Sequence, residues 1–581
     1  MLSVGKKFVV AVFALISMFL LVNGVTNYGD VSGREFLYMG ILLLVFLMVA
    51  LIINKIITYL AEEKVFVLLY CMKRKMMIAE IVSISVCAVI TLVSRFVIAA
   101  RVQISTIGEE YEKLPQLFPA RKVYEAFVGI FEGMAGGSIS GYELCNIFCN
   151  IVAMVFIYLI VRSMYGRSGG ILALFIAACW PSHMYGVVYY NPQYFCGMLF
   201  LAVIYFIMLS RKGALWYVFA ALTGVALGLL IYMQTGMILF VVVLLASLFV
   251  RGDEGKERTL GENFMKRIPA VAVSLGVALI VNIGVNGMVA TSLDLPSSKV
   301  TGMNGYAMLT GFNEESKGKE NKEDYDYLMN NYKEGNNPKD AQMLCLGKVY
   351  DRVSENFGGT VNMILQKAQY VFGCGYDLAI RVDMSASKMI FVQDAYYLLI
   401  LLGTGILAIE LLQRQHHGYI NFVLGVGSLL VFAGALFETG TGVQLEFGFI
   451  LAICSSAIVS ILYRRALGDD TIHTIEEIRR RQMEEEKKKQ QWTAGVIGKL
   501  HGGNVPGETQ GMTEEEEAEY FFDEEEMEEA DNVDPELEEL LSKLSIDPSK
   551  LVSENVREKR MKKIQQAKEK QKQKQDNFDA S

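Results

Sequence analysis

The segment Ile78–Ala100 reads IAEIVSISVCAVITLVSRFVIAA, and the polar segment Arg101–Glu143 follows it directly. Apart from Glu80 and Arg95, the first of these segments carries no charged side chain. At 1.5 Å per residue, a helix of this length crosses a hydrocarbon core of about 30 Å. We therefore predict a transmembrane helix that leads into a polar loop at a membrane surface.

The composition of the whole chain agrees with a membrane protein. The 581 residues are 52% hydrophobic with a mean hydropathy of +0.33, which excludes a soluble globule of ordinary makeup. The formal charge of −8 belongs mostly to the C-terminal tail and the polar loops, so it says little about partners. Nine cysteines are scattered without a CxxC pair, and the loop that holds Cys345 and Cys374 leaves a disulfide between them open.

Twelve apolar segments are candidate transmembrane helices, and most are long enough to span the bilayer. They are Phe8–Val25, Phe36–Ile53, Ile78–Ala100, Leu144–Val161, Gly169–Val188, Tyr194–Ser210, Ala214–Met233, Gly236–Val250, Ile268–Ala290, Met389–Leu412, Tyr419–Phe437 and Val443–Tyr463. The first segment follows Lys6 and Lys7 as a signal peptide would, but the spans behind it favour a retained anchor.

Basic residues fall on alternate loops between these segments, which predicts an orientation. They include Lys6, Lys7, Lys55, Lys64, Lys73, Arg74, Lys75, Arg162, Arg167, Arg211, Lys212, Arg251, Arg267, Arg414, Arg464 and Arg465. The positive-inside rule places these loops in the cytoplasm. We therefore predict a multi-pass protein of the cell membrane with both termini cytoplasmic and with residues 101–143 and 291–388 outside.

The second outer loop, residues 291–388, is too long for a bare connection. Its first half is rich in glycine, asparagine and aspartate, which favour turns. Its second half predicts two helices, around Ala341–Glu355 and Thr360–Phe372, separated by Gly358 and Gly359. We expect a small, partly helical cap on the outer membrane face.

The chain divides into three predicted parts. Residues 1–77 hold two transmembrane helices and a cytoplasmic connection, residues 78–465 form the main transmembrane domain, and residues 466–581 form a charged tail. The tail includes a charged helix around Thr474–Gln491, and its sequence cannot bury enough apolar area to fold alone. Two readings stay open, a solvated tail and a segment that binds a cytoplasmic protein partner.

Several short motifs between Ile78 and Tyr463 resemble one enzyme superfamily. They are YELCNI at Tyr142–Ile147, YLIV at Tyr158–Val161, YGR at Tyr165–Arg167, WPS at Trp180–Ser182, YYN at Tyr189–Asn191, a G-x-N-x-x-S-x-G-x-x-N-x-x-D pattern at Gly311–Asp324, and QKAQY at Gln366–Tyr370. In their order and spacing, they are similar to bacterial membrane glycosyltransferases of the GT-C superfamily, those related to protein O-mannosyltransferases and aminoarabinose transferases. The implied fold is an all-α multi-pass membrane protein, with a GT-C-like bundle of about 12 transmembrane helices.

The resemblance implies an enzyme that transfers a sugar from a polyprenyl-phosphate carrier on the outer face. Such chemistry needs a carboxylate base for the acceptor hydroxyl and cations or donors for the leaving phosphate. The family places an aspartate soon after its first catalytic-domain span, whereas this chain has Glu109 and Glu110 there. Glu109 is the first candidate for the catalytic base and Glu110 the second, and the alternative is a solvated helix start.

The last family motif, E-x-x-x-R-Y before the final span, has no counterpart here, because no Arg or Lys lies between Phe437 and Tyr463. The candidate phosphate ligands are therefore Arg95, Arg101, Arg121, Lys122, Lys367 and Arg381. The candidates for contact with the sugar are His183, Tyr189, Tyr190, Asn191 and Gln193. The alternatives are a core position for His183 and an interfacial aromatic belt for the tyrosines.

The sequence has no P-loop, no metal-ligand spacing and no nucleophile elbow, so we expect no metal and no other cofactor. The leading hypothesis is transfer of a glycosyl group from a lipid-linked donor to an extracytoplasmic cell-envelope acceptor, with membrane lipid as the second partner and no nucleic acid. One alternative is a catalytically lapsed GT-C fold whose tail recruits cytoplasmic partners. A second is a lipid or solute transporter, although no inverted repeat or set of intramembrane charges supports it.

Overall fold

The computed structural model describes residues 2–26, 73–101, 116–136, 139–188, 190, 192–210, 215–247, 260–333, 337–372, 387–413, 418–437 and 443–466. Contacts divide the chain into two units, Met1–Tyr59 with Leu69–Leu467, and Leu60–Leu68 with Gly468–Ser581. All the described residues belong to the first unit. The predicted span Phe36–Ile53 and all but the first residue of the predicted tail lie outside them.

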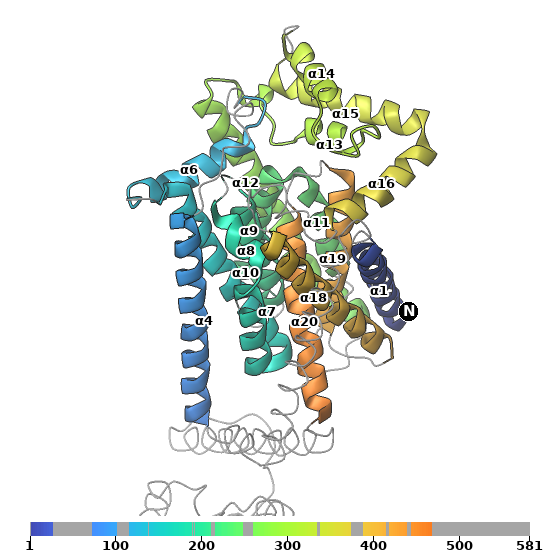
Figure 1. Ribbon diagram of the computed structural model, residues 1–581. Coiled ribbons are helices and arrows are strands. Elements are labelled where there is room, and N and C mark those ends of the chain that lie inside the picture. The colour runs from blue at the N-terminus through green and yellow to red at the C-terminus, as the bar shows by residue number, and fades with distance from the viewer. Residues whose placement is uncertain are drawn as a thin grey trace, which may run out of the picture. The chain divides into compact units, whose positions relative to one another are not determined.

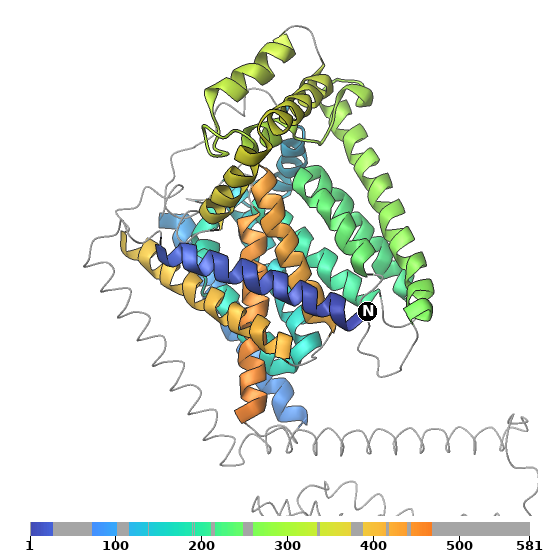
Figure 2. The same cartoon turned by 90° about the vertical axis from the view of Figure 1, so that its right-hand side faces the viewer.

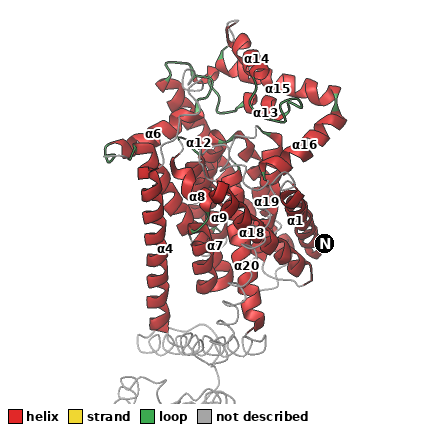
Figure 3. Cartoon of the chain, viewed as in Figure 1, coloured by secondary structure: helices red, strands yellow, loops and turns green. Residues whose placement is uncertain are grey.

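The described part of the chain is almost entirely helical and contains no strand beyond an isolated bridge between Gly136 and Ile139 (Figure 3). The membrane-embedded helices and their short 3₁₀ neighbours are α1 (Leu2–Thr26), α4 (Lys73–Arg101), α7 (Gly141–Ala178), α8 (Pro181–Tyr185), η2 (Gly186–Val188), α9 (Gln193–Leu209), α10 (Trp216–Met233), η3 (Thr235–Leu239), α11 (Phe240–Ser247), α12 (Leu260–Ser292), α18 (Ser387–Gln413), α19 (Gly418–Leu436) and α20 (Gln444–Ala466). Among the described residues, six helices are long and apolar enough to cross a membrane, in α4, α7, α10, α12, α19 and α20, and four shorter apolar stretches accompany them. The chain is a helical membrane protein.

One predicted span differs from the structure. The segment Gly169–Val188 is not one helix, because α7 ends at Ala178 and the separate helices α8 and η2 follow. Pro181 begins α8 at a position where a missing N–H costs nothing. A second break lies inside α7 itself, where Gly166 has φ +80° and ψ −171°, a conformation that favours glycine. Apolar composition alone does not show either break.

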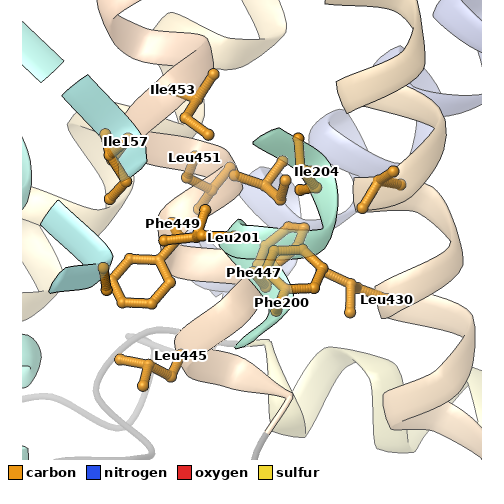
Figure 4. Close-up of a cluster of buried hydrophobic side chains, with 14 of the residues drawn as sticks. Ile157, Phe200, Leu201, Ile204, Leu430, Leu445, Phe447, Phe449, Leu451 and Ile453 are labelled. Carbon is orange, nitrogen blue, oxygen red and sulfur yellow. The ribbon is translucent and has the colours of Figure 1, made fainter. Parts of the chain in front are cut away.

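Helix α20 packs against α7, α9, α18 and α19, and α9 packs against α7, α10 and α20. Their buried side chains form one apolar cluster, of which Figure 4 shows a part: Ile157, Phe200, Leu201, Ile204, Leu430, Leu445, Phe447, Phe449, Leu451 and Ile453. Helix α1 packs along α18 and α19 at another side of the same core (Figure 2). This packing carries the start of α9, the end of α19 and the start of α20 to one region.

Residues 291–388, the second predicted outer loop, contain more helix than predicted. Besides η4 (Ser297–Lys299), it holds α13 (Gly305–Gly311), α14 (Lys322–Lys333), α15 (Pro338–Glu355) and α16 (Phe357–Val371). The second pair confirms the two helices expected there, whereas the first pair replaces the expected run of turns. Asn304, Asn337 and Asn356 cap three of these helices by accepting a hydrogen bond from a backbone N–H. We call residues 305–371 the cap (Figure 1).

The cap has a small core of its own. It is formed by Leu117, Tyr306, Leu309, Phe312, Leu328, Ala341, Cys345, Val349 and Met363. Gln342 joins the cap to the segment before α6 (Ala120–Glu132), since its Nε2 donates to the carbonyl of Leu117 at 2.9 Å. Cys345 is a free thiol in this core, where burial raises its pKa to about 12, and Cys374 lies outside the described residues.

Helices α10 and α12 are held together by close backbone contact. A Cβ atom on Gly224 would lie 2.5 Å from the carbonyl oxygen of Ser274, and one on Gly228 would lie 2.6 Å from that of Ala278. The Ser274 hydroxyl also donates to the carbonyl of Ala220 at 2.9 Å. Small residues at such an interface are the usual means by which helices associate in a membrane.

Replacing Gly228 by Ala should therefore weaken this helix pair by about 1–3 kcal/mol, the usual cost of overpacking. The added methyl group has no space unless the two helices separate. The measurement is the midpoint of SDS-induced unfolding of the protein in mild detergent. The control is Gly284→Ala on α12, where a Cβ meets nothing within 4 Å. Equal midpoints for the two variants would contradict the close contact.

Candidate functional site

Helix α6 places two of the candidate phosphate ligands, Arg121 and Lys122, against the carboxylate of Glu125. Lys122 Nζ lies 2.6 Å from Glu125 Oε2, and Arg121 Nε lies 3.6 Å from Glu125 Oε1. The guanidinium of Arg121 also lies 4.9 Å from the ring centroid of Tyr190. The structure thus brings Arg121, with its neighbour Lys122, against Tyr190, which the sequence analysis selected from a different segment.

The aromatic residues around Tyr190 fix this arrangement to the start of α7. The rings of Tyr124 and Tyr142 pack edge-on against Tyr190, with centroids 5.4 and 5.5 Å away. The Tyr124 hydroxyl donates to Asn146 Oδ1 at 2.8 Å, and Asn146 Nδ2 donates to the carbonyl of Val187 at 3.0 Å. Burial raises the pKa of Tyr124, so its hydroxyl remains a donor at neutral pH. This chain of contacts joins α6, α7 and η2.

Arg95 is a fully buried cation in α4. Its Nε donates to Asn150 Oδ1 at 3.2 Å, and its Nη1 donates to the carbonyl of Ala178 at 2.9 Å and to Ser94 Oγ at 2.9 Å. Its Nη2 and the Nδ2 of Asn150 have no hydrogen-bond partner among the described residues. Arg95 therefore joins α4 to Asn150 in the first part of α7 and to Ala178 at the end of α7, close to the start of α8.

His183 and Gln193 are both buried, at α8 and at the first residue of α9. The imidazole of His183 is stacked on Trp180 with ring centroids 4.8 Å apart, and Phe449 lies equally close. The carbonyl of His183 accepts from the Tyr194 hydroxyl at 2.8 Å. A Cβ on Gly448 would lie 2.8 Å from His183 Nε2, so α20 approaches the ring closely. His183 thus packs between α8 and α20.

The pattern Gly311–Asp324 forms a network of hydrogen bonds within the cap. The buried carboxylate of Asp324 accepts from Asn313 Nδ2 at 2.9 Å and from Asn321 Nδ2 at 2.7 Å. It also forms an ion pair with Arg352 of α15 at 2.6 Å. Asn313 Oδ1 in turn accepts from the backbone N–H of Ser316 at 3.1 Å. The polar residues of the pattern therefore bind one another, and together they fix the loop between α13 and α14.

The two glycines of this pattern make room for Lys367. Lys367 is buried in α16, and its Nζ donates to the carbonyl of Gly311 at 2.9 Å. A Cβ on Gly311 would lie 2.7 Å from the carbonyl oxygen of Leu436 and 2.9 Å from Lys367 Nζ. Gly318, at φ +74°, lies against the aliphatic part of the same lysine. Lys367 thereby joins α16 to the end of α13, at the point where Gly311 lies against the end of α19.

A cavity of about 170 Å³ lies next to this contact. It is lined by Pro192, Met233, Gln234, Thr235, Gly236, Asn304, Ala307, Ala433, Phe437 and Val443. Its walls therefore come from the start of α9, the α10–η3 junction, the first turn of α13, and the connection between α19 and α20. The cavity occupies the region where the start of the cap meets α9, α10, α19 and the segment before α20.

The structure describes only part of the predicted site. Glu109, Glu110, Tyr189 and Asn191 lie outside the described residues, and Arg101 ends α4 with its side chain outside them. The sequence analysis did not select Asn304 or Gln234, although the polar Gln234–Thr235 pair interrupts two apolar segments and was a visible signal. No cluster of three or more His, Cys, Asp or Glu side chains in the described part of the chain could hold a metal ion.

Comparison with known proteins gives one family and several distant structures. Residues 123–283 match the family model of dolichyl-phosphate-mannose-protein mannosyltransferases. No curated protein sequence matches the chain. Among solved structures, the oligosaccharyltransferase AglB from Archaeoglobus fulgidus, in complex with an inhibitory peptide and a dolichol-phosphate, is similar with a TM-score of 0.38 and 12% identity over 69% of this chain and 51% of that one.

A second solved structure is ArnT from Cupriavidus metallidurans bound to undecaprenyl phosphate. It is similar with a TM-score of 0.28 and 10% identity over 65% of this chain and 77% of that one. The chain spans about half the length of the AglB structures that it matches. The family model covers most of α6, the helices from α7 to α11 and most of α12; it includes Tyr190, Tyr124 and Tyr142 and begins just after Arg121 and Lys122. The match of residues 123–283 confirms the resemblance of this chain to glycosyltransferases of the GT-C superfamily.

Proposed function

We propose that this protein transfers a glycosyl group from a polyprenyl-phosphate-linked sugar to an extracytoplasmic acceptor of the cell envelope. The observation that carries the proposal is the match of residues 123–283 to the mannosyltransferase family model. The matched stretch contains Tyr190 and Glu125, and Arg121 and Lys122, which directly precede the stretch, lie against them. Arginine offers bidentate hydrogen bonds to phosphate, and a tyrosine hydroxyl suits a sugar, so this cluster supports the proposed substrate class.

The proposed reaction is a single displacement at the sugar. The acceptor hydroxyl oxygen forms a bond to the anomeric carbon as the bond between that carbon and the phosphate oxygen breaks, and the lipid phosphate leaves as an anion. The proton of the acceptor hydroxyl passes to the carboxylate of Glu109, or of Glu110 if that residue faces the substrate. Arg101, Arg121 and Lys122 are the proposed ligands of the phosphate.

The remaining predicted residues contribute to the site in different ways. Tyr189, Asn191 and Gln193 are proposed to contact the sugar from the segment around Tyr190. His183 and Lys367 are buried within the described part of the chain, at 2% and 1% exposure, so each acts through the segments that it fixes. We infer that His183 positions the start of α9 and that Lys367 positions the cap over the membrane helices.

The proposed orientation places the reaction outside the cytoplasm. The alternating basic loops support an outer position for residues 101–143 and 291–388, which hold the proposed base and the cap, and a cytoplasmic position for both termini. The acceptor is therefore proposed to be a glycan, lipid or protein of the envelope.

A second candidate function is a membrane scaffold that has lost catalysis. The sequence favours it in two places, since Glu109–Glu110 replaces the family aspartate and no Arg or Lys lies between Phe437 and Tyr463. In that case, residues 466–581 recruit a cytoplasmic protein and the outer site binds no donor.

The test uses the full-length protein in lipid nanodiscs with polyprenyl-phosphate mannose or glucose and an envelope extract as acceptor. The expected result is time-dependent release of free polyprenyl phosphate with glycosylation of the acceptor, measured by mass spectrometry. Failure to consume any lipid-linked sugar, while the protein binds a cytoplasmic partner through its tail, would establish the scaffold instead.

A further inference from the structure

We propose that the cavity between the cap and the membrane helices binds the sugar ring of the donor, one monosaccharide at a time. This inference rests on the proposed function and specifies where the transferred group lies. The size of the cavity supports a single ring. Its volume is about 170 Å³, and an engineered protein cavity of about 150 Å³ holds one benzene molecule. There is room for one six-membered ring but not for a disaccharide.

The residues that line the cavity suit an uncharged group with one apolar side and one polar side. Met233, Phe437 and Val443 give the cavity an apolar side, while Gln234, Thr235 and Asn304 give it a polar side. A pyranose has the same division, since its C–H faces are apolar and its hydroxyl edge is polar. None of the ten lining residues is charged, so the cavity does not suit the phosphate. An isoprenoid chain could not form hydrogen bonds with the polar side.

The hydrogen bonds of the polar side leave one donor for a ligand. The Thr235 hydroxyl accepts from the backbone N–H of Asn304 at 2.8 Å and donates to the carbonyl of Gly302 at 3.4 Å. The Oδ1 atom of Asn304 accepts from the backbone N–H of Ala307 at 2.9 Å, which caps α13. These bonds fix the Asn304 side chain through its oxygen. The amide Nδ2 of Asn304 is not used in the hydrogen bonds of the described residues, and it can donate to a sugar hydroxyl.

The cavity exists only while the cap is seated on the membrane helices. Ala307 belongs to the cap and Asn304 directly precedes it. Ala433 belongs to α19 and Phe437 directly follows that helix. Next to the cavity, Gly311 approaches the carbon of the Phe437 carbonyl so closely that a Cβ would lie 2.6 Å from it. Lys367 holds Gly311 there. The position of the sugar is thus coupled to the position of the cap, which gives Lys367 a role without contact to substrate.

The test compares two asparagines that each cap the N-terminus of a helix, Asn304 at α13 and Asn337 at α15. Asn304→Ser keeps a hydroxyl that can cap α13 and removes the Nδ2 donor. Asn337→Ser makes the same change at the cap of α15, which does not line the cavity. Ala307→Val is a second variant, which fills the cavity with methyl groups. Binding of polyprenyl-phosphate mannose, polyprenyl-phosphate glucose and sugar-free polyprenyl phosphate is measured with the full-length protein in nanodiscs, together with its thermal stability.

For at least one of the two sugars, Asn304→Ser should weaken binding about three- to tenfold, the equivalent of one neutral hydrogen bond. Ala307→Val should weaken it more than tenfold, and Asn337→Ser should leave it unchanged. Binding of sugar-free polyprenyl phosphate should not change in any variant. If Ala307→Val weakens binding of the sugar-free lipid equally, the occupant is the hydrocarbon chain. If the parent binds the lipid-linked sugars and neither cavity variant weakens them, the sugar lies elsewhere while the proposed function stands. A parent that binds none of the lipids overturns the proposed function itself.

Discussion

Glu109→Gln should lower the rate of glycosyl transfer by about 10²–10⁴, the usual contribution of a positioned proton acceptor. The amide of glutamine is close in shape to the carboxylate but does not accept the proton of the attacking hydroxyl. Binding of the lipid-linked donor should be preserved, because the base contacts the acceptor and not the phosphate. The measurement is single-turnover transfer from polyprenyl-phosphate sugar, with donor binding determined separately.

Glu110→Gln and Glu112→Gln complete this experiment within the same acidic run. Adjacent side chains at the start of a helix diverge by about 100°, so only one of Glu109 and Glu110 can face the substrate. We expect the Glu109 variant to lose most of the rate and the Glu112 variant, the matched control, to keep it. If the variants at 109 and 110 and their double variant all turn over like the parent, the base lies elsewhere.

Asp324→Ala should lower the local stability of the cap by about 3–5 kcal/mol, the usual effect of removing one partner from a buried ion pair. The carboxylate is 1% exposed and accepts hydrogen bonds from Asn313, Asn321 and Arg352. Its removal leaves these donors without their acceptor and releases the loop that holds Gly311 on α19. Hydrogen exchange of the amides of α13 and α15 measures this opening directly.

The matched control for this variant is Asp326→Ala on the same helix. Asp326 is exposed, so its replacement should change amide exchange in the cap very little. Asp324→Ala should also weaken glycosyl transfer, because the cap then no longer closes the cavity beside Asn304. Unchanged amide exchange in Asp324→Ala would mean that the hydrogen-bond network around Asp324 does not stabilise the cap.

The sequence predicted those features of the fold that depend on local patterns. Helices α15 and α16 were expected because the second half of the loop looks helical around Ala341–Glu355 and Thr360–Phe372, with Gly358 and Gly359 between the two. The break after Ala178 was missed because apolar content continues through it, and only backbone geometry shows that Pro181 begins a new helix. The Gly311–Asp324 pattern was visible as a motif, but the mutual hydrogen bonds of its polar residues depend on folding.

The candidate site was predicted in part for the same reason. Arg121 and Tyr190 were selected as residue types suited to phosphate and sugar. In the structure, the guanidinium carbon of Arg121 lies 4.9 Å from the ring centroid of Tyr190. The cavity could not be predicted, because its walls come from segments between Pro192 and Val443 that only tertiary packing brings together. Arg95 was visible as a charge in an apolar span, but its bonds to Asn150 and Ala178 depend on the docking of α4 on α7.

The contact between α10 and α12 has a practical consequence for handling the protein outside its membrane. Figure 2 shows the two green helices side by side, and a series of polar bonds joins them: Ser274 to Ala220, Asn282 to Gly228, and Tyr232 to Asn286. The strength of such bonds and of close backbone packing does not come from exclusion of water, because lipid chains are as apolar as the helices themselves. A detergent micelle offers the same apolar medium. Exchange of lipid for a mild detergent therefore leaves this pair in register, and α10 and α12 are the natural place for a paired label that reports whether the purified protein is intact.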